Sequence, residues 1–262
     1  MPLTTQQSKH IREYLANKIR QKLNTYNPET KSMPFHFRLL GKNRMALFSF
    51  IHSVNTMLGT SIFEQVGKKI VEERAKRAIG QYKEFEGYIS SEAVLKIDNI
   101  MRELRSASRK PNKEKETKEI LAAASKGKLG KKLKKRVDLF IEMKDGTEYY
   151  FELKTVKPNI NEFTAIKKQM LEWIALRGSQ QSKTNIKTVV AIPYNPYEPE
   201  PYERWTLQGL FDLRQEVLIG QGFWDFLGGK DTYEDLLNVF EQTGLELYDE
   251  IDKKMKSLSD EK

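Results

Sequence analysis

The sequence predicts an α/β fold with a central mixed β-sheet flanked by helices, and three segments carry this prediction. Residues 136–154 alternate apolar and polar side chains on both sides of a short break, which is the pattern of a β-hairpin. Residues 161–177 show the apolar face of a helix, and 186–192 form a continuous apolar run like an interior strand. A strand, a helix and a parallel strand make a βαβ unit, which together with the hairpin gives a mixed sheet. One further strand before residue 136 is missing from this pattern.

Helices are expected on both sides of this unit. The helices expected before it span residues 5–26, 43–57, 58 to about 79, and 92–104. Those expected after it span 232–242 and 245–255, beyond a proline-rich extended segment at 193–205. Residues 106–118 read as a loop or a weak helix. Because no internal repeat or long linker interrupts the chain, we expect a single domain with a mainly helical part (1–125), a core (126–192) and a C-terminal part (193–262).

The turn at residues 144–146 decides which side chains share a face of the hairpin. A two-residue turn would put Asp138 and Glu152 on opposite faces. A three-residue turn pairs Met143 with Thr147 and places Asp138 opposite Glu152. The sequence allows both registers. The three-residue turn is favoured because only its last position needs a positive φ, and that residue is glycine.

Asp138, Glu152 and Lys154 are the charged residues that this hairpin has to accommodate. Acidic residues are depleted from strands, and a carboxylate that faces a core is costly unless it is paired. Two carboxylates on one face can share a cation, and Mg²⁺ takes oxygen ligands while keeping several waters. Such a cation activates a bound water and offsets charge that develops on a phosphate. Lys154 could position or help deprotonate that water, or contact the phosphate directly.

Glu64 has two interpretations, and the sequence leaves both open. Ser61 and Glu64 have the spacing of a capping box, in which Glu64 would only bond the helix backbone. In a helix that runs to about residue 79, Glu64 would instead head a face of small and apolar residues. That face comprises Gly67, Val71, Ala75 and Ala78. An acid in this position could point inward and assist a metal, and Gly67, which costs about 1 kcal/mol of helix stability, suggests that another element approaches closely.

Basic residues dominate the charge of the chain, and its formal charge of +9 suits a polyanionic partner. Seven of the eleven residues from 126 to 136 are basic. This run could be a solvated loop, but it leads directly into the strand of Asp138, so phosphate contacts are the favoured interpretation. The expected DNA-backbone contacts are Lys128, Lys131, Lys132, Lys134, Lys135, Arg136, Lys157 and Arg204.

The composition also narrows the class of protein. The chain has no cysteine and only three scattered histidines, which argues against disulfides, zinc sites and histidine-based nucleases. No apolar run reaches the roughly 20 residues of a membrane span, and the first 20 residues lack the apolar segment of a signal peptide. We therefore expect a cytoplasmic protein that does not bind a membrane.

Asp138 followed by Glu152-Leu153-Lys154 resembles the motif of the PD-(D/E)XK nuclease superfamily, with Val137 in place of the usual proline. The resemblance implies a restriction-endonuclease-like core, catalytic roles for all three charged residues, and Mg²⁺ held by the two acids. These nucleases commonly carry an extra acid on a helix before the hairpin, and Phe63-Glu64 resembles that helix. The bare spacing recurs at Asp98 with Glu116-Thr117-Lys118 and at Asp235 with Asp252-Lys253-Lys254, but in polar, helix-like sequence where these groups are expected to be solvated.

Several segments together resemble a type II restriction endonuclease, most closely the TdeIII/MjaII-like group, over about residues 38–242. The segments are Phe63-Glu64, Arg136-Val137-Asp138, Phe151 to Thr155, and Phe223-Trp224 to Gly229. The resemblance implies a homodimer that cuts both strands of double-stranded DNA at a short GC-rich palindrome and leaves 5′-phosphate ends. The alternatives are a repair or recombination nuclease of the same superfamily and a basic DNA-binding module whose acids are incidental.

Overall fold

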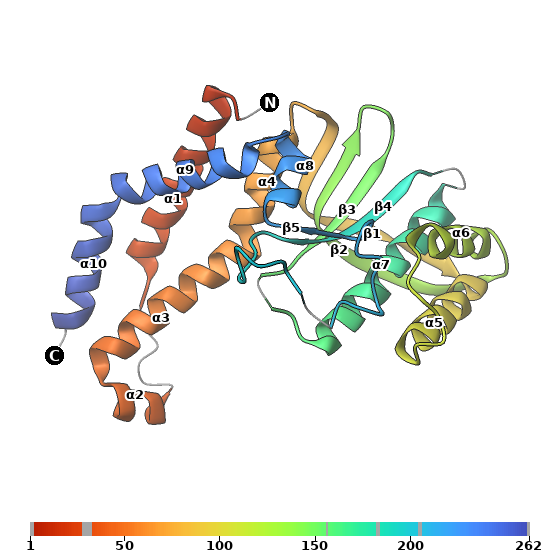
Figure 1. Ribbon diagram of the computed structural model, residues 1–262, viewed down its shortest axis with the longest axis horizontal. Helices are drawn as coiled ribbons and strands as arrows, with labels where there is room; N and C mark the ends of the chain where they lie inside the picture. Colours follow the sequence, from red (N-terminus) through yellow and green to blue (C-terminus); the bar gives the residue numbers. More distant parts are fainter. Residues whose placement is uncertain (1–2, 28–32, 156, 182–183, 204–205, 261–262) are drawn as a thin grey trace.

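The centre of the fold is a five-stranded mixed sheet with helices on both faces, which confirms the predicted α/β architecture (Figure 1). The computed structural model describes residues 3–27, 33–155, 157–181, 184–203 and 206–260. The strands are β1 (Ala75–Ser90), β2 (Leu129–Met143), β3 (Glu148–Leu153), β4 (Ile186–Ile192) and β5 (Val217–Ile219). They lie side by side in chain order. β1, β2 and β3 are antiparallel, whereas β4 and β5 continue the sheet parallel to β3.

The helices form two layers and an extension. Before the sheet the chain forms α1 (Thr5–Thr25), α2 (Pro34–Leu40), α3 (Lys42–Met57), the π-helical turn η1 (Leu58–Ile62) and α4 (Phe63–Val71). Within and after the sheet it forms α5 (Ser91–Arg105), α6 (Lys113–Ala124), α7 (Ile160–Gln180), α8 (Gln221–Gly228), α9 (Thr232–Glu246) and α10 (Tyr248–Asp260). Buried apolar residues of α5, α6 and α7 pack on one face of the sheet, and those of α4 and α8 pack on the other. A smaller cluster joins α1, α3 and α10, which extend away from the sheet with α2 (Figure 1).

The structure corrects the expected third helix. α4 ends at Val71, and the segment from Ala75 onward is strand β1 rather than further helix. Its backbone pairs with β2 along most of its length, with Ile79 opposite Phe140 and Gly80 opposite Leu139. Local helix preference is a weak signal that such long-range pairing overrides. This strand is the one that the sequence pattern lacked.

Two other segments differ from the sequence reading for related reasons. The basic run is not a loop, because strand β2 begins at Leu129. The backbone of its lysines pairs with β1, so that Lys132 lies opposite Tyr88. Leu133 alternates with these lysines and is buried, so the strand pattern was present but its partner strand was not recognised. The segment read as a loop or weak helix contains α6, whose start is capped by the Asn112 side chain accepting from the backbone N–H of Lys115 at 2.8 Å.

Candidate active site

The hairpin of β2 and β3 brings Asp138 and Glu152 together, because it uses the three-residue turn. The backbone N–H of Met143 donates to the carbonyl of Thr147 at 2.8 Å, and Gly146 has φ +83°. Leu139 lies opposite Phe151, so the same register, extended by one residue, sets Asp138 opposite Glu152. Both carboxylates are buried. The predicted register is confirmed, and with it the shared position of the two acids at the open end of the hairpin.

Each of the two carboxylates has defined partners. The backbone N–H of Leu153 donates to Oδ2 of Asp138 at 2.9 Å. Lys154 Nζ lies 2.8 Å from Oε1 of Glu152, and Gln169 on α7 donates from Nε2 to the other oxygen at 2.8 Å. The structure therefore holds Asp138, Glu152 and Lys154 in one cluster. Gln169 was not predicted, because its reach depends on how α7 crosses the sheet, and no sequence pattern reports that angle.

Glu64 joins this cluster and is not a helix cap. Helices α3, η1 and α4 follow one another without a break, so no helix begins at Glu64 that it could cap. The Ser61 hydroxyl donates instead to the carbonyl of Met57 at 3.0 Å. The Glu64 side chain is only 1% exposed, and its Oε2 has no hydrogen-bond partner among the described residues. The capping interpretation is therefore wrong. The close approach inferred from Gly67 is confirmed, because a Cβ there would lie 3.1 Å from Leu139.

Arg136 bridges the two halves of the cluster. Its Nη2 lies 2.7 Å from Oε1 of Glu64, and its Nε lies 3.3 Å from Oδ1 of Asp138. Arg136 is expected from the sequence to contact phosphate together with the lysines, but its guanidinium lies between two acids of the candidate site. A signal was present in the sequence, since residues two apart on a strand share a face and Arg136 precedes Asp138 by two.

Burial and mutual repulsion dominate the electrostatics of the acids. Burial, reinforced by the charge of Asp138, raises the pKa of Glu64 to about 7, although Arg136 opposes this rise. Burial also raises the pKa of Asp138, and burial together with Asp138 raises that of Glu152. Burial alone would lower the pKa of Lys154, but Glu152 and Asp138 outweigh it and raise that pKa. Among the described residues, the cluster has three acids but only two cations, Arg136 and Lys154. A further cation would therefore stabilise the ionised form of the acids.

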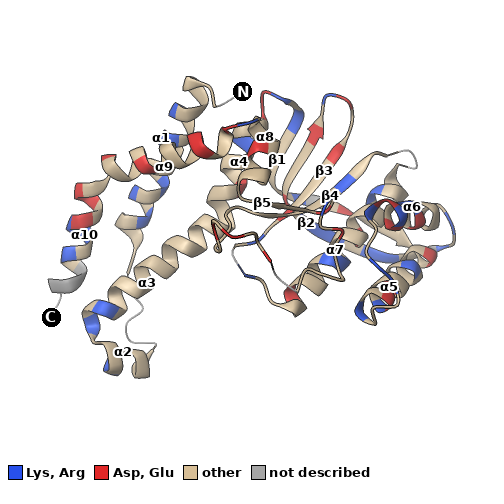
Figure 2. Ribbon diagram, in the orientation of Figure 1, with Lys and Arg blue, Asp and Glu red and all other residues tan. Residues whose placement is uncertain are grey.

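The lysines of the basic run divide into two sets. Lys131 and Lys135 form ion pairs with Glu172, a buried acid of α7, and the Lys131 pair measures 3.6 Å. Lys132 and Lys134 are exposed and form no ion pair with any described residue, and Lys128 is exposed before the strand begins. Figure 2 shows Lys and Arg gathered around α5, α6 and the start of β2, whereas acidic residues mark α9 and α10.

The two remaining basic candidates follow the sheet. Lys157 is exposed three residues after Lys154, and its Nζ lies 4.4 Å from the ring centre of Tyr197. This contact joins the segment after β3 to the proline-rich segment after β4. Arg204 lies outside the described residues.

Comparison with known proteins identifies the family. A family model described as "Type II restriction endonuclease, HinfI" matches residues 3–244. The chain belongs to this family of type II restriction endonucleases. It is 27% identical to the type II restriction enzyme HgiEI of Herpetosiphon aurantiacus over 94% of this chain and 96% of that enzyme. It is 30% identical to the type II restriction enzyme MjaII of Methanocaldococcus jannaschii, over 80% of this chain and 62% of that enzyme.

The family defines the general activity. A type II restriction endonuclease is a site-specific deoxyribonuclease, and its substrate is double-stranded DNA. The resemblance to the MjaII-like group inferred from sequence motifs is confirmed. Type II restriction endonucleases generally use a divalent metal ion.

The candidate site fits such an ion in its donor chemistry. Asp138 and Glu152 offer carboxylate oxygens, and the unpartnered Oε2 of Glu64 is an orphaned buried acceptor beside them. No group of three or more acidic or histidine side chains within the described part of the chain is already arranged to hold a metal. In this endonuclease Arg136 stands between Glu64 and Asp138. The pair of Asp138 and Glu152 suits an ion that keeps several waters, while Glu64 can join only if Arg136 moves.

Proposed function

We propose that this endonuclease hydrolyses DNA at a Mg²⁺ site held by Asp138 and Glu152, with Glu64 as an additional acid. The observation that carries the proposal is that the two acids lie opposite each other on β2 and β3, with Lys154 Nζ 2.8 Å from Glu152. When bound, Mg²⁺ supplies an activated water and offsets charge developing on the phosphate. Burial of the acids excludes competing water and keeps their oxygens fixed.

Lys154 and Arg136 act as cations in this proposal. Since the pKa of Lys154 is raised above its ordinary value, its ammonium group stays protonated near neutral pH. Orienting the attacking water or contacting the phosphate therefore suits Lys154 better than removing a proton. Arg136 balances Glu64 and Asp138 while no DNA is bound, and it is half exposed, so it can turn toward a phosphate. Gln169 fixes the second oxygen of Glu152 and is a positioning residue.

The DNA backbone is the expected partner of the exposed lysines. Lys128, Lys132, Lys134 and Lys157 are exposed, and neutralising phosphates is the main source of affinity for DNA. Lys131 and Lys135 contribute less, because Glu172 already pairs with them.

We further propose a homodimer in the cytoplasm that cuts a short GC-rich palindrome and leaves 5′-phosphate ends. One site handles one phosphodiester, whereas cutting a duplex requires two cuts on strands of opposite polarity. A two-fold pair of subunits meets that geometry and matches a palindromic target. The GC-rich target rests on the resemblance to the MjaII-like group. The whole chain, with its helical, core and C-terminal parts, forms one nuclease domain in this proposal.

Incubation with a long duplex and Mg²⁺ tests the proposal. We expect discrete fragments with 5′-phosphate ends, and none when Mg²⁺ is withheld. A smear would indicate a nuclease without a defined target, as in repair. A mobility shift without cutting would indicate a DNA-binding module whose acids are incidental. Either result would overturn the proposed function.

A further inference from the structure

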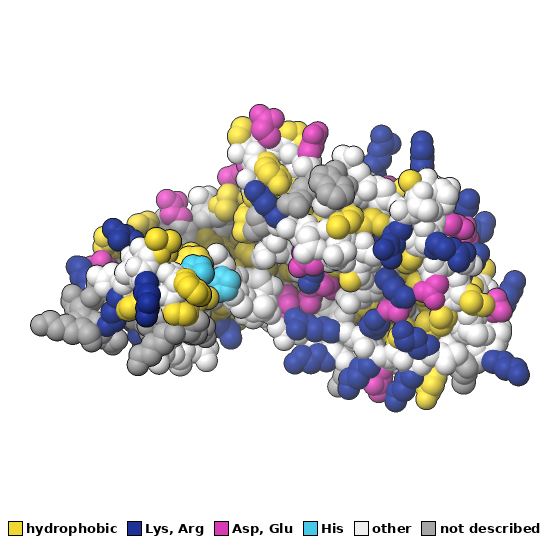
Figure 3. Space-filling view, turned by 90° about the horizontal axis from the view of Figure 1, so that it is seen from below, with side chains coloured by type: hydrophobic (Ala, Val, Ile, Leu, Met, Phe, Trp, Pro, Cys, Tyr) yellow, Lys and Arg dark blue, Asp and Glu magenta, His cyan; other side chains and the backbone are white. Residues whose placement is uncertain are grey.

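The arm formed by α2 and α3 exposes more large apolar side chains than any function described so far explains. Six of them define the arm face, namely Phe35, Phe37, Leu39, Leu47, Phe48 and Ile51. Phe35 is 85% exposed and Leu39 84%, and the three residues on α3 are about half exposed. Viewed from below, hydrophobic and histidine side chains gather at the arm end of the molecule, whereas Lys and Arg cover the core (Figure 3).

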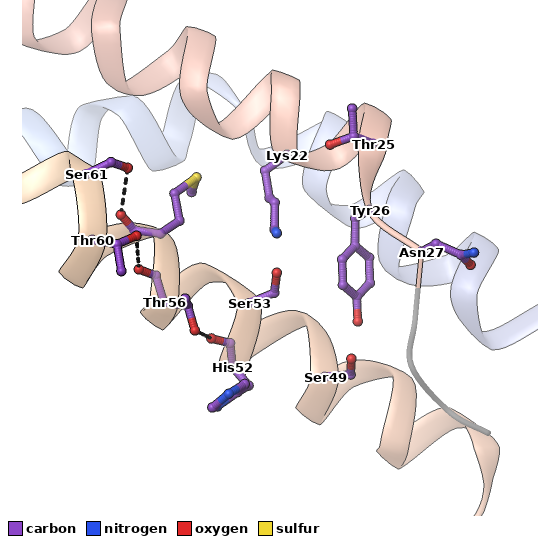
Figure 4. Close-up of a pocket in the computed structure, with 11 residues that line it drawn as sticks. Lys22, Thr25, Tyr26, Asn27, Ser49, His52, Ser53, Thr56, Thr60 and Ser61 are labelled. Atoms are coloured by element: carbon purple, nitrogen blue, oxygen red, sulfur yellow. Dashed lines mark hydrogen bonds between the residues drawn. The ribbon is translucent and has the colours of Figure 1, made fainter. Parts of the chain in front are cut away.

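The fold does not need this face. α3 buries Met45, Ala46 and Phe50 on its inner side, and Ala46 and Phe50 cluster with residues of α1. The inner side also borders a groove of about 620 Å³ against α1, lined by hydroxyl groups and Lys22 (Figure 4). The hydroxyls of Thr56 and Thr60 donate to carbonyls one turn earlier in the helix. The residues that α3 contributes to the arm face lie on the opposite side of the helix from its buried residues. α3 therefore has one face that packs inside the protein and one apolar face that is exposed.

The area of the arm face matches one half of a protein–protein interface. With about 150–250 Å² for an aromatic side chain, the exposed fractions of the three phenylalanines correspond to roughly 260–430 Å² of apolar surface. The two leucines and the isoleucine add a similar total exposed fraction. Monomeric proteins rarely leave more than a few hundred Å² of apolar surface in one patch. Each partner of a standard interface contributes about 800 Å². The arm face therefore approaches the size that a stable dimer needs.

A membrane span does not fit this part of the fold. By length and composition the continuous helix Lys42–Val71, which has 30 residues, could cross a bilayer, contrary to the expectation from the sequence. Its most apolar 18-residue window has a mean hydropathy of 1.2, and 22% of that window is buried. Its second half, however, is part of the nuclease core, where Val66 and Ile70 are buried and Glu64 contacts Arg136. A span would have to place this acid and its partner in hydrocarbon, at a cost that the water-facing alternative avoids.

Charge favours a second copy of this chain as the occupant. The sequence has no Asp or Glu from residue 31 to residue 63, and the arm carries Arg38, Lys42 and Arg44. The same chain offers the complement on α9 and α10, where Leu245 and Tyr248 are more than half exposed beside the acidic first turn of α10. In a two-fold pair each surface is used twice, so one chain can supply both kinds of surface.

The position of the arm relates this surface to the reaction. Directly after α3, Gly59 in η1 lies against Thr155, the residue after Lys154, and a Cβ at Gly59 would be 3.0 Å from that side chain. We infer that the arm face is the homodimer interface and that it sets two active sites on either side of one duplex. This inference rests on the proposed homodimer and assigns the surface that forms it.

Sedimentation equilibrium of the full chain without DNA or metal tests the interface independently of cleavage. The variant is Phe35→Ser/Leu39→Ser, and the matched control is Leu95→Ser, a leucine on α5 that is 58% exposed. Because the replaced side chains are exposed, the circular dichroism spectrum should be unchanged, whereas the melting temperature of the variant should fall only as far as the lost association lowers it. We expect the wild type and the control to be dimers. The dimer dissociation constant of the variant should rise roughly 100-fold or more, because central interface residues are lost. In cleavage of supercoiled plasmid the variant should accumulate nicked circles before linear product.

Several results would overturn the inference. They are a wild type that stays monomeric, a variant that dimerises as tightly as the wild type, and a wild type that sediments with lipid vesicles. A variant that remains dimeric but loses DNA binding in Ca²⁺ would make the arm face a DNA contact instead. A wild-type dimer that the variant breaks, but that does not cut DNA, would support the interface and refute the proposed function.

Discussion

Replacing Lys167 with methionine should lower the free energy of unfolding far more than the same change at its neighbour Lys168. Lys167 is fully buried on α7, with its Nζ 2.6 Å from Glu216 and 2.7 Å from Glu116, two acids that are also fully buried. Lys113 completes the group, with its Nζ 3.3 Å from Glu216. The four charges balance, and they tie α6 and α7 to the segment that leads into β5. α7 also carries Gln169, which holds Glu152, so this cluster supports the candidate active site.

The contrast in burial sets the magnitude. Removing one partner of a buried ion pair typically costs about 3–5 kcal/mol, because the remaining charge is left without a partner. Lys168 pairs with Asp98 at 2.9 Å, but the two side chains are 46% and 55% exposed, and such pairs are worth about 0–1 kcal/mol. For a chain of this size the Lys167→Met change corresponds to a fall in melting temperature of about 10 °C. Lys168→Met should lower it by no more than about 4 °C.

Urea titration and thermal melts of the two variants measure this difference. Adding Glu116→Gln to Lys167→Met restores the charge balance of the cluster and should recover part of the lost stability, which a double-mutant cycle quantifies. Equal losses for Lys167→Met and Lys168→Met would refute the reasoning. So would a double variant whose loss is the sum of the two single losses.

Three further predictions concern the site itself. Asp138→Ala should abolish cleavage while retaining binding to duplex DNA in Ca²⁺, since that ion supports binding with a different geometry; residual Mg²⁺-dependent cutting would exclude this acid as a ligand. Lys132→Ala should reduce the slope of log affinity against log salt by about 0.9, whereas Lys135→Ala should change it less, because Glu172 already pairs with Lys135; equal changes would contradict the division. The pKa of Glu64 is raised from 4.5 to about 7 in the folded chain. The folded chain therefore binds this proton more tightly than the unfolded chain does, and the free energy of unfolding should fall as pH rises from about 4.5 to about 7. Mn²⁺ binding measured by calorimetry should strengthen as pH rises through about 7, and an unchanged pH dependence in Glu64→Gln would count against its role.

The features of the site that depend on neighbouring residues could be predicted from the sequence. The alternation along β2 and β3 and the glycine of the turn depend only on neighbouring residues, so the register that sets Asp138 opposite Glu152 could be derived. The strand β4 was likewise predicted with the bounds that the structure shows. Strand β1 was missed because its small residues also fit a helix, and only its pairing with β2 decides between them.

Tertiary contacts account for the rest. Glu116 was expected to be solvated in polar sequence, but it is buried and forms an ion pair with Lys167, which lies far along the chain on α7. Arg136 reaches Glu64, and Gln169 reaches Glu152, only because α4 and α7 pack against the sheet. Periodicity reports which side of an element is buried, and it does not report which charged partner lies across the interface.

Anomalous scattering from crystals soaked in Mn²⁺ tests the central claim, that these acids form the metal site of the nuclease, most directly. The account predicts an anomalous peak in contact with carboxylate oxygens of Asp138 and Glu152, and loss of that peak in Glu152→Ala. If Arg136 moves to admit Glu64, its guanidinium should leave the position between Glu64 and Asp138 when the ion binds. A peak at other acids of the chain, with Asp138 and Glu152 keeping their present partners, would contradict the account.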